Sequence, residues 1–176
     1  NEELIPRYLG AVIENVVVEE SPVWLQNRLK SIGVSPINNV VDITNYILHG
    51  YGQPLHAFDA DKISGQKIKV GVVDAGTRLI TLDGVERTLN GSEIVVKDGQ
   101  NKPLAIAGVL GGATSGVNSE TINIFLEGAY FNPVAVRKSA KYHGLNTDAS
   151  FRFERGIDPN NVKTAITHAI KMITDI

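Results

Sequence analysis

The order of secondary-structure signals along the chain constrains its fold more than any other feature. One extended segment is followed by two helical segments, then by a long run of short strands, then by two more helices. In residue numbers these segments are 8–18, 21–32, 39–49, 67–130, 132–143 and a last helix from 158. Helices and strands would alternate in a doubly wound sheet, and here they do not. The order therefore predicts an α+β fold, with a β-barrel or sandwich of short strands flanked by helices.

Turn and capping residues set the boundaries of these segments. Proline follows a residue that can cap a helix at positions 21–22, 132–133 and 158–159, which is typical of helix starts. Gly33 is expected to end the first helix. Asp-Gly pairs at 83–84 and 98–99 predict hairpin turns between the short strands.

Apolar periodicity predicts how some of these segments pack. The first helix has an apolar face, expected in the core, made of Trp24, Leu25, Leu29 and Ile32. The last helix has an apolar stripe made of Val162, Ile166, Ala169, Ile170 and Ile173. Phe151 and Phe153 alternate with polar neighbours, which is typical of a half-buried strand.

Composition limits the size and class of the protein. With 176 residues, 43% of them hydrophobic, the chain can form one domain spanning 1–176 or two small intertwined subdomains. Aromatic residues make up only 6%, so we expect a mostly aliphatic core. The first residue is not Met and the last lie within a helical pattern, so the chain is interpreted as a fragment of a longer protein.

Charge and cysteine content exclude several function classes. A formal net charge of -2 gives no broad electrostatic attraction for nucleic acid, so any such partner would be contacted locally. The absence of cysteine excludes disulfides, thiolate catalysis and thiolate metal sites. No apolar run is long enough to span a bilayer, so no membrane partner is expected. We expect a cytoplasmic protein.

Three separated segments place polar groups beside glycine-rich or turn backbone. They are GQPLHAFD (52–59), AGVLGG (107–112) and NTDASFRFERGIDP (146–159). The glycines of the second segment would let backbone groups approach a ligand closely, but their spacing alone favours a bulge or turn at a strand end. That segment is no phosphate loop, because no Gly-Lys-Ser/Thr follows. Together the segments predict a pocket that binds a small polar ligand and positions a water, as in hydrolytic proofreading.

Several polar residues are candidates for this pocket. His56 can orient or deprotonate a water, or be a structural histidine. Thr44 and Asn45 lie inside a predicted helix and either contact a ligand or form a solvated face. The other histidines lack the paired spacing of metal ligands, so no metal site is expected. The serines lack a GxSxG elbow, so a serine hydrolase of that type is not expected.

Glu127 and the segment from 146 each allow two interpretations. Glu127 interrupts the apolar run 124–130. If its carboxylate points inward it needs a donor, such as a ligand hydroxyl, and if it points outward strand alternation explains it. The hydroxyls near Thr147 either line the pocket, with a nearby Arg contacting phosphate, or form a turn into the next strand.

Five segments in fixed order resemble one known family. DITNY, GQPLHAFD, AGVLGG, FLEGAYFNP and NTDASFRFERGIDP are similar to the editing module of bacterial phenylalanyl-tRNA synthetase β-subunits. The resemblance covers nearly the whole chain. It implies hydrolysis of tyrosine wrongly attached to phenylalanine tRNA. The family's aminoacylation site, anticodon-binding part and metal site are missing from this chain.

The resemblance also implies roles for particular residues. Glu127 would accept a hydrogen bond from the tyrosine phenol, helped by backbone near Gly108 and Gly111. Thr147 and Ala149 would shape the pocket. The residues expected near the ester and the terminal ribose, positioning a water, are His56, Thr44 and Asn45.

Partners and cofactors follow from the same resemblance. We expect the acceptor end of phenylalanine tRNA, the tyrosine moiety and the synthetase α-subunit as partners. No cofactor is expected in this fragment, whereas the parent synthetase would use ATP and magnesium. Two other classes stay open: a module that binds the tRNA acceptor end without turnover, and a module that docks the subunits.

Overall fold

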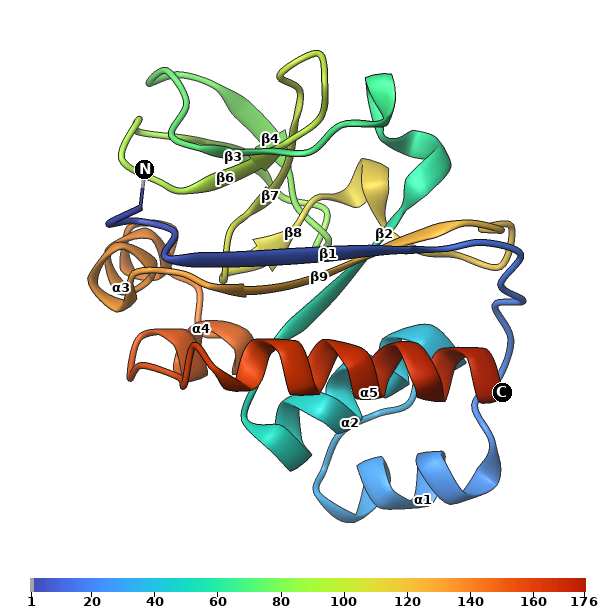
Figure 1. Ribbon diagram of the computed structural model, residues 1–176. Coiled ribbons are helices and arrows are strands. Elements are labelled where there is room, and N and C mark those ends of the chain that lie inside the picture. Colours follow the sequence, from blue (N-terminus) through green and yellow to red (C-terminus); the bar gives the residue numbers. More distant parts are fainter. Residues whose placement is uncertain (1) are drawn as a thin grey trace.

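A computed structural model describes residues 2–176, and it has the predicted α+β architecture (Figure 1). Its α-helices are α1 (Val23–Ser31), α2 (Asn39–Tyr51), α3 (Pro133–Tyr142), α4 (Asp148–Phe153) and α5 (Asn161–Asp175). Its strands are β1 (Arg7–Ile13), β2 (Leu55–Asp59), β3 (Lys69–Gly71), β4 (Arg78–Ile80), β5 (Glu86–Thr88), β6 (Val95–Lys97), β7 (Pro103–Ile106), β8 (Leu110–Gly111) and β9 (Ile124–Tyr130). Three short 3₁₀ turns are η1 (Ala60–Lys62), η2 (Ser64–Gln66) and η3 (Ala113–Ser115).

The strands form three antiparallel groups. The sheet with order β1-β9-β2 crosses the middle of the molecule, and a second sheet has the order β3-β6-β7-β8. Strands β4 and β5 pair as a hairpin around the predicted Asp-Gly turn. Among residues 2–176 no sheet closes on itself, so a closed barrel is absent from this part of the chain.

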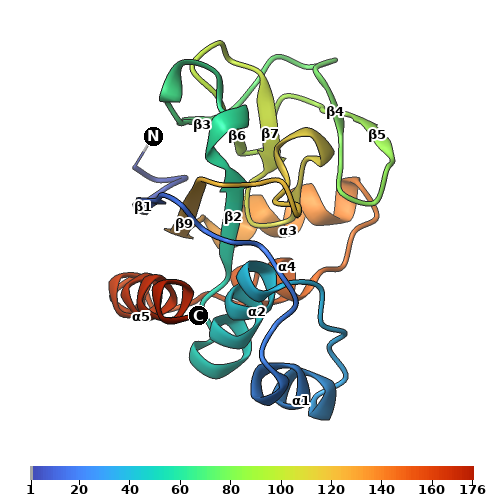
Figure 2. The same cartoon turned by 90° about the vertical axis from the view of Figure 1, so that its right-hand side faces the viewer.

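The two faces of the central sheet have different partners. Helices α1, α2 and α5 lie below it in Figures 1 and 2, and the second sheet lies above it. Residues such as Ile124 and Leu126 of β9 pack with the helices, whereas Phe58 and Ala129 pack with the second sheet, α3 and α4. This division follows from strand alternation, because successive side chains point to opposite faces. The central sheet therefore separates two hydrophobic cores.

Capping explains where the helices that flank the site begin and end. The Asn38 side chain accepts a hydrogen bond from the Val41 N–H at the start of α2, and Gly52 ends that helix in the left-handed conformation at φ +68°. Thr147 and Ser150 form a reciprocal capping box at the start of α4. The strand predicted around Phe151 and Phe153 is therefore wrong, because the capping box starts a short helix there.

Two other predictions differ from the structure. Within the expected apolar face of α1, Leu25 and Leu29 are buried, but Trp24 and Ile32 are 45% and 54% exposed. A nine-residue helix on the edge of the molecule buries only a narrow stripe. The first strand ends at Ile13 rather than near residue 18, because Asn15 adopts a left-handed conformation (φ 57°) that breaks the ladder.

Candidate functional site

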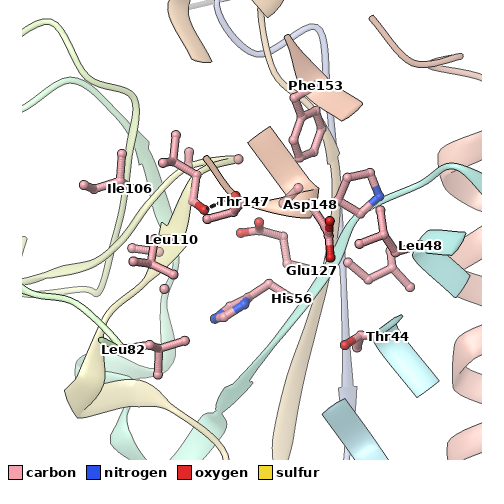
Figure 3. Close-up of a pocket in the computed structure, with 18 of the residues that line it drawn as sticks. Thr44, Leu48, His56, Leu82, Ile106, Leu110, Glu127, Thr147, Asp148 and Phe153 are labelled. Carbon is pink, nitrogen blue, oxygen red and sulfur yellow. Dashed lines mark hydrogen bonds between the residues drawn. The ribbon is translucent and has the colours of Figure 1, made fainter. Parts of the chain in front are cut away.

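A cavity of about 270 Å³ lies between the central sheet, the loop joining β7 to β8, and helices α2 and α4 (Figure 3). Its lining residues are Thr44, Asn45, Leu48, Pro54, Leu55, His56, Leu82, Ala105, Ile106, Ala107, Gly108, Val109, Leu110, Gly111, Glu127, Thr147, Asp148, Ala149 and Phe153. No lysine or arginine belongs to this lining. The cavity is therefore mostly apolar, with a few polar groups, as is usual for a small-molecule site.

The eight residues predicted from the sequence all line this one cavity. They come from separate elements: Thr44 and Asn45 from α2, His56 from β2, Gly108 and Gly111 from the β7–β8 region, Glu127 from β9, Thr147 and Ala149 from the start of α4. Fold topology brings together residues as distant in sequence as Thr44 and Ala149. Their roles toward a ligand stay predictions.

His56 points into the cavity and is partly buried (Figure 3). Its ring packs edge-on against Phe58, with ring centroids 4.4 Å apart. Burial lowers the pKa of His56 to about 4, so the ring is neutral at pH 7. A neutral imidazole can accept a hydrogen bond from a water, but it is a weak base.

Gly111 makes room for that imidazole. A Cβ at position 111 would lie 2.6 Å from His56 Cε1 and 2.9 Å from His56 Nε2, closer than van der Waals contact allows. The backbone of Gly111 also accepts a hydrogen bond from the Leu82 N–H at 2.9 Å. A side chain at position 111 would therefore push the histidine out of place. Glycine is required here for close packing rather than for a positive φ.

Glu127 stands directly opposite His56 on the neighbouring strand of the central sheet. Residues paired in this way share one face, so both side chains project toward the cavity (Figure 3). Glu127 is only 6% exposed, and its Oε2 accepts a hydrogen bond from the Tyr8 hydroxyl at 2.6 Å. Burial raises the pKa of Glu127 to about 7, although the Tyr8 hydrogen bond opposes that rise. The carboxylate therefore points inward, the alternative that requires a donor.

The two polar residues of α2 lie at the edge of the cavity. Thr44 is buried, and its hydroxyl donates to the Val41 carbonyl at 2.7 Å, which leaves its oxygen free to accept. Asn45 lines the cavity beside it. The alternative of a solvated helix face is therefore wrong for Thr44.

The start of α4 is tied to the loop that carries Gly108. The Thr147 hydroxyl donates to the Val109 carbonyl at 2.8 Å (Figure 3). It also accepts from the Ser150 N–H at 3.0 Å. Gly108 adopts φ +69°, and a Cβ there would lie 2.9 Å from the Phe153 ring. These contacts fix the wall formed by α4 against the β7–β8 loop.

Some cavity residues were not predicted from the sequence. Leu82 arrives from the β4–β5 hairpin, and Asp148 follows Thr147 with a side chain that is 71% exposed. Tyr8 does not belong to the lining, but it contacts the lining residue Glu127 through strand pairing and is distant in sequence from every recognised segment. Only the register of β1 against β9 could have indicated it.

Other ionisable clusters lie away from the cavity. The His143 ring meets the buried Glu93 carboxylate at 2.9 Å, and the His168 ring meets the Tyr51 hydroxyl at 2.6 Å. Across residues 2–176 no group of three or more His, Asp or Glu is placed to hold a metal ion. In the same residues, no helix has both the length and the apolarity needed to cross a membrane.

Comparison with known families shows to which family the chain belongs. The profile of the B3/4 domain matches residues 4–176, so the chain is a member of the B3/4 domain family. Relatives are the phenylalanine–tRNA ligase β-subunits of Bacteroides fragilis, 53% identical over 176 residues, and of Carboxydothermus hydrogenoformans, 51% identical over 176 residues. In both cases the whole chain is covered, but it spans only 21% and 22% of the relatives. The resemblance to these β-subunits is confirmed.

A solved structure supports the fold. An N-terminal fragment of the phenylalanyl-tRNA synthetase β-subunit from Pyrococcus horikoshii matches with a TM-score of 0.54. The match covers 80% of this chain and 46% of that one, at 16% sequence identity. At this identity the similarity establishes a shared fold.

Proposed function

We propose that this chain is an editing domain that hydrolyses tyrosine esterified to phenylalanine tRNA, within a phenylalanyl-tRNA synthetase. The observation that carries the proposal is the buried Glu127 carboxylate, which faces a mostly apolar cavity without a cationic partner in the lining. A mostly apolar cavity with a buried carboxylate acceptor suits a phenol ring and its hydroxyl. Membership of the B3/4 family and the similarity to β-subunits support the same substrate class.

Physical chemistry explains why a synthetase needs, besides its synthetic site, an editing site that requires the tyrosine hydroxyl. A pocket built for phenylalanine rejects an added hydroxyl only weakly. A pocket with a buried acceptor positioned for a hydroxyl rejects phenylalanine more strongly. When phenylalanine binds, the acceptor loses its hydrogen bond to water and gains no new hydrogen bond. The penalty for such an unpaired group is about 1–3 kcal/mol, or about 10- to 100-fold in rate. Glu127 would thus select tyrosine, with the backbone at Gly108 and Gly111 and the wall at Thr147 and Ala149 shaping the site.

The remaining polar groups would act at the ester. A water oxygen attacks the ester carbonyl carbon, the bond to the ribose oxygen breaks, and the products are free tyrosine and tRNA with its hydroxyl restored. The neutral His56 ring would accept a hydrogen bond from that water, and its low basicity favours positioning over full proton removal. Thr44 and Asn45 would hold the terminal ribose. No covalent intermediate is required.

The other partners of the proposed function belong to the larger assembly. The chain spans about a fifth of the β-subunits it matches, so tRNA binding would depend largely on other parts of the synthetase. We expect the α-subunit as a partner there, and ATP and magnesium at the synthetic site. Cytoplasmic localisation stays a prediction.

The test is deacylation of phenylalanine tRNA charged with tyrosine or with phenylalanine, by the full synthetase and its Glu127→Ala variant. The exposed Glu120→Ala is the matched control, since it removes a carboxylate outside the cavity. We expect the wild type and the control to clear the tyrosyl ester preferentially, and Glu127→Ala to lose about 10- to 100-fold of that preference.

The same experiment separates the alternatives. A module that only binds the acceptor end would bind both charged tRNAs and hydrolyse neither. A docking module would neither bind the charged tRNAs nor hydrolyse them, but deleting it would disturb assembly of the two subunits. Unchanged preference in Glu127→Ala would show that this carboxylate is structural.

A further inference from the structure

The hydroxyl of Tyr8 already holds one oxygen of the Glu127 carboxylate. Strands β1 and β9 pair antiparallel, with Gly10 opposite Glu127 and Tyr8 opposite Ala129. Residues 8 and 10 share a face of β1, so Tyr8 reaches Glu127 diagonally from the same face. The Tyr8 hydroxyl donates to Glu127 Oε2 at 2.6 Å. A phenol within the protein therefore makes the contact that the substrate phenol would make.

The other described residues on this face of the central sheet provide no second hydrogen-bond donor to the Glu127 carboxylate. A Cβ at Gly10 would lie 2.2 Å from the Phe125 ring, so the position directly opposite Glu127 is filled by an aromatic ring. The Tyr8 ring packs near Phe131, with centroids 6.4 Å apart. Among residues 2–176, Tyr8 is the only hydrogen-bond donor that reaches the Glu127 carboxylate, and Oε1 receives none.

The charged and titratable groups facing Glu127 do not replace that donor. His56 on β2 is neutral, because burial lowers its pKa to about 4. Asp148 on α4 is an exposed acid whose Oδ2 lies 3.8 Å from His49 Nε2 of α2. The lining contributed by the β7–β8 region has no ionisable side chain. Burial and the neighbouring Glu127 raise the pKa of Tyr8, so its phenol stays protonated and remains a donor.

We propose that Tyr8 is a positioning residue, which fixes Oε2 of Glu127 so that Oε1 is presented to the ligand phenol as an ionised acceptor. This inference rests on the proposed function, in which Glu127 reads the tyrosine hydroxyl. A carboxylate has room for several donors, so it can accept the internal phenol and the ligand phenol together. An ionised acceptor binds a hydroxyl more strongly than a protonated one, because charge-assisted hydrogen bonds are about twice as strong.

The consequence is a pH-dependent selectivity set by Tyr8. Burial raises the pKa of Glu127 to about 7 and the Tyr8 hydrogen bond opposes that rise. Tyr8→Phe removes this hydrogen-bond donor and therefore raises the pKa of Glu127. A hydrogen bond to a charged group corresponds to a shift of about one to two pH units. Near neutral pH the variant then has a mostly protonated acceptor.

The experiment measures the ratio of tyrosyl to phenylalanyl deacylation rates between pH 5.5 and 9 with the full synthetase. The ratio cancels the pH dependence that is common to both esters. In the wild type we expect it to rise with a midpoint near 7, and in Tyr8→Phe the midpoint moves up by about one to two units. Tyr130→Phe, on the same sheet and outside the cavity lining, is the matched control and keeps the wild-type midpoint.

A double variant tests whether Tyr8 acts through Glu127. In a Glu127→Gln background, Tyr8→Phe should leave the remaining ratio unchanged, since no carboxylate is left to position. An unmoved midpoint in Tyr8→Phe, with both esters slowed equally or not at all, overturns the inference for Tyr8 while the proposed function stands. Selectivity that survives unchanged in Glu127→Gln overturns the role given to Glu127, and the inference for Tyr8 with it, whereas a wild type that clears neither ester overturns the proposed function as well.

Discussion

Replacing Gly111 by alanine tests whether the cavity depends on the exact seating of His56. The backbone at 111 is not in the left-handed region, so alanine adds no backbone strain there. The whole effect comes from a Cβ placed 2.6 Å from His56 Cε1 and 3.0 Å from Leu82 Cδ1. The imidazole must move by several tenths of an ångström, and its contact with Phe58 limits where it can go.

The size of the effect of Gly111→Ala depends on which atoms the added Cβ displaces. The displaced atoms belong to side-chain ends, so the loss of stability should be near the low end of overpacking, about 1 kcal/mol. Misplacing a group that positions the attacking water costs more, about 10- to 100-fold in deacylation rate. In Gly112→Ala the added Cβ would instead meet the Leu104 carbonyl oxygen at 2.4 Å. Backbone cannot yield so easily, so that variant should lose about 3 kcal/mol of stability.

The assay combines tyrosyl-tRNA deacylation with hydrogen exchange of the peptides covering β2 and β8, both in the full synthetase. Gly71→Ala is the control, because among the described residues no atom other than those of its chain neighbours lies within 4 Å of the added Cβ. We expect Gly111→Ala to lose activity with little loss of protection, Gly112→Ala to lose both, and Gly71→Ala to lose neither. A Gly111→Ala variant as active as Gly71→Ala would refute the role given to His56.

Three further predictions concern stability. Because the folded pKa of Glu127 is about 7, above its usual 4.5, the folded state binds an extra proton between these pH values and loses stability as pH rises through them. Hydrogen exchange at pH 5 and pH 8 should show this loss of stability in the wild type and a smaller loss in Glu127→Gln. Equal losses in the two proteins would contradict the prediction. Thr147→Val should cost about 1–2 kcal/mol by removing the α4 cap, whereas Thr147→Ser keeps the hydroxyl and should be near neutral; comparable protection of α4 in both variants would refute the cap. Glu93→Ala should lower the local unfolding free energy, followed by hydrogen exchange, by about 3 kcal/mol, because it removes a fully buried carboxylate that binds His143. Glu86→Ala, in the exposed pair with Arg78, should lower it by only about 0–1 kcal/mol. Similar losses in the two variants would contradict the burial argument.

The fold class was predictable because local signals agree with the element order. The capping residues at Asn132 and the Asp-Gly hairpin at 83–84 act within a few residues, so sequence alone predicts them. The strand expected at Phe151 and Phe153 was wrong, because alternation over a few residues does not outweigh the capping box at Thr147. Closure into a barrel depends on long-range pairing, which no local pattern determines.

The candidate site was predictable to the extent that its residues lie in recognisable segments. His56, Gly111 and Glu127 come from three such segments, and the structure places them around one cavity. Tyr8 carried no local signal, because its contact with Glu127 arises from a strand pairing 119 residues apart in sequence. The shared cavity leaves the role of each residue to be tested.

The most direct test of the central claim is binding of two non-hydrolysable ligands, adenosine carrying tyrosine or phenylalanine through a 3′-amide. Titration of each into the full synthetase, wild type and Glu127→Ala, measures how the cavity reads the phenol hydroxyl without any turnover. The account predicts a preference for the tyrosyl ligand of about 10- to 100-fold in the wild type, lost in Glu127→Ala. Equal affinity of the wild type for both ligands, or a preference that survives the substitution, would contradict it.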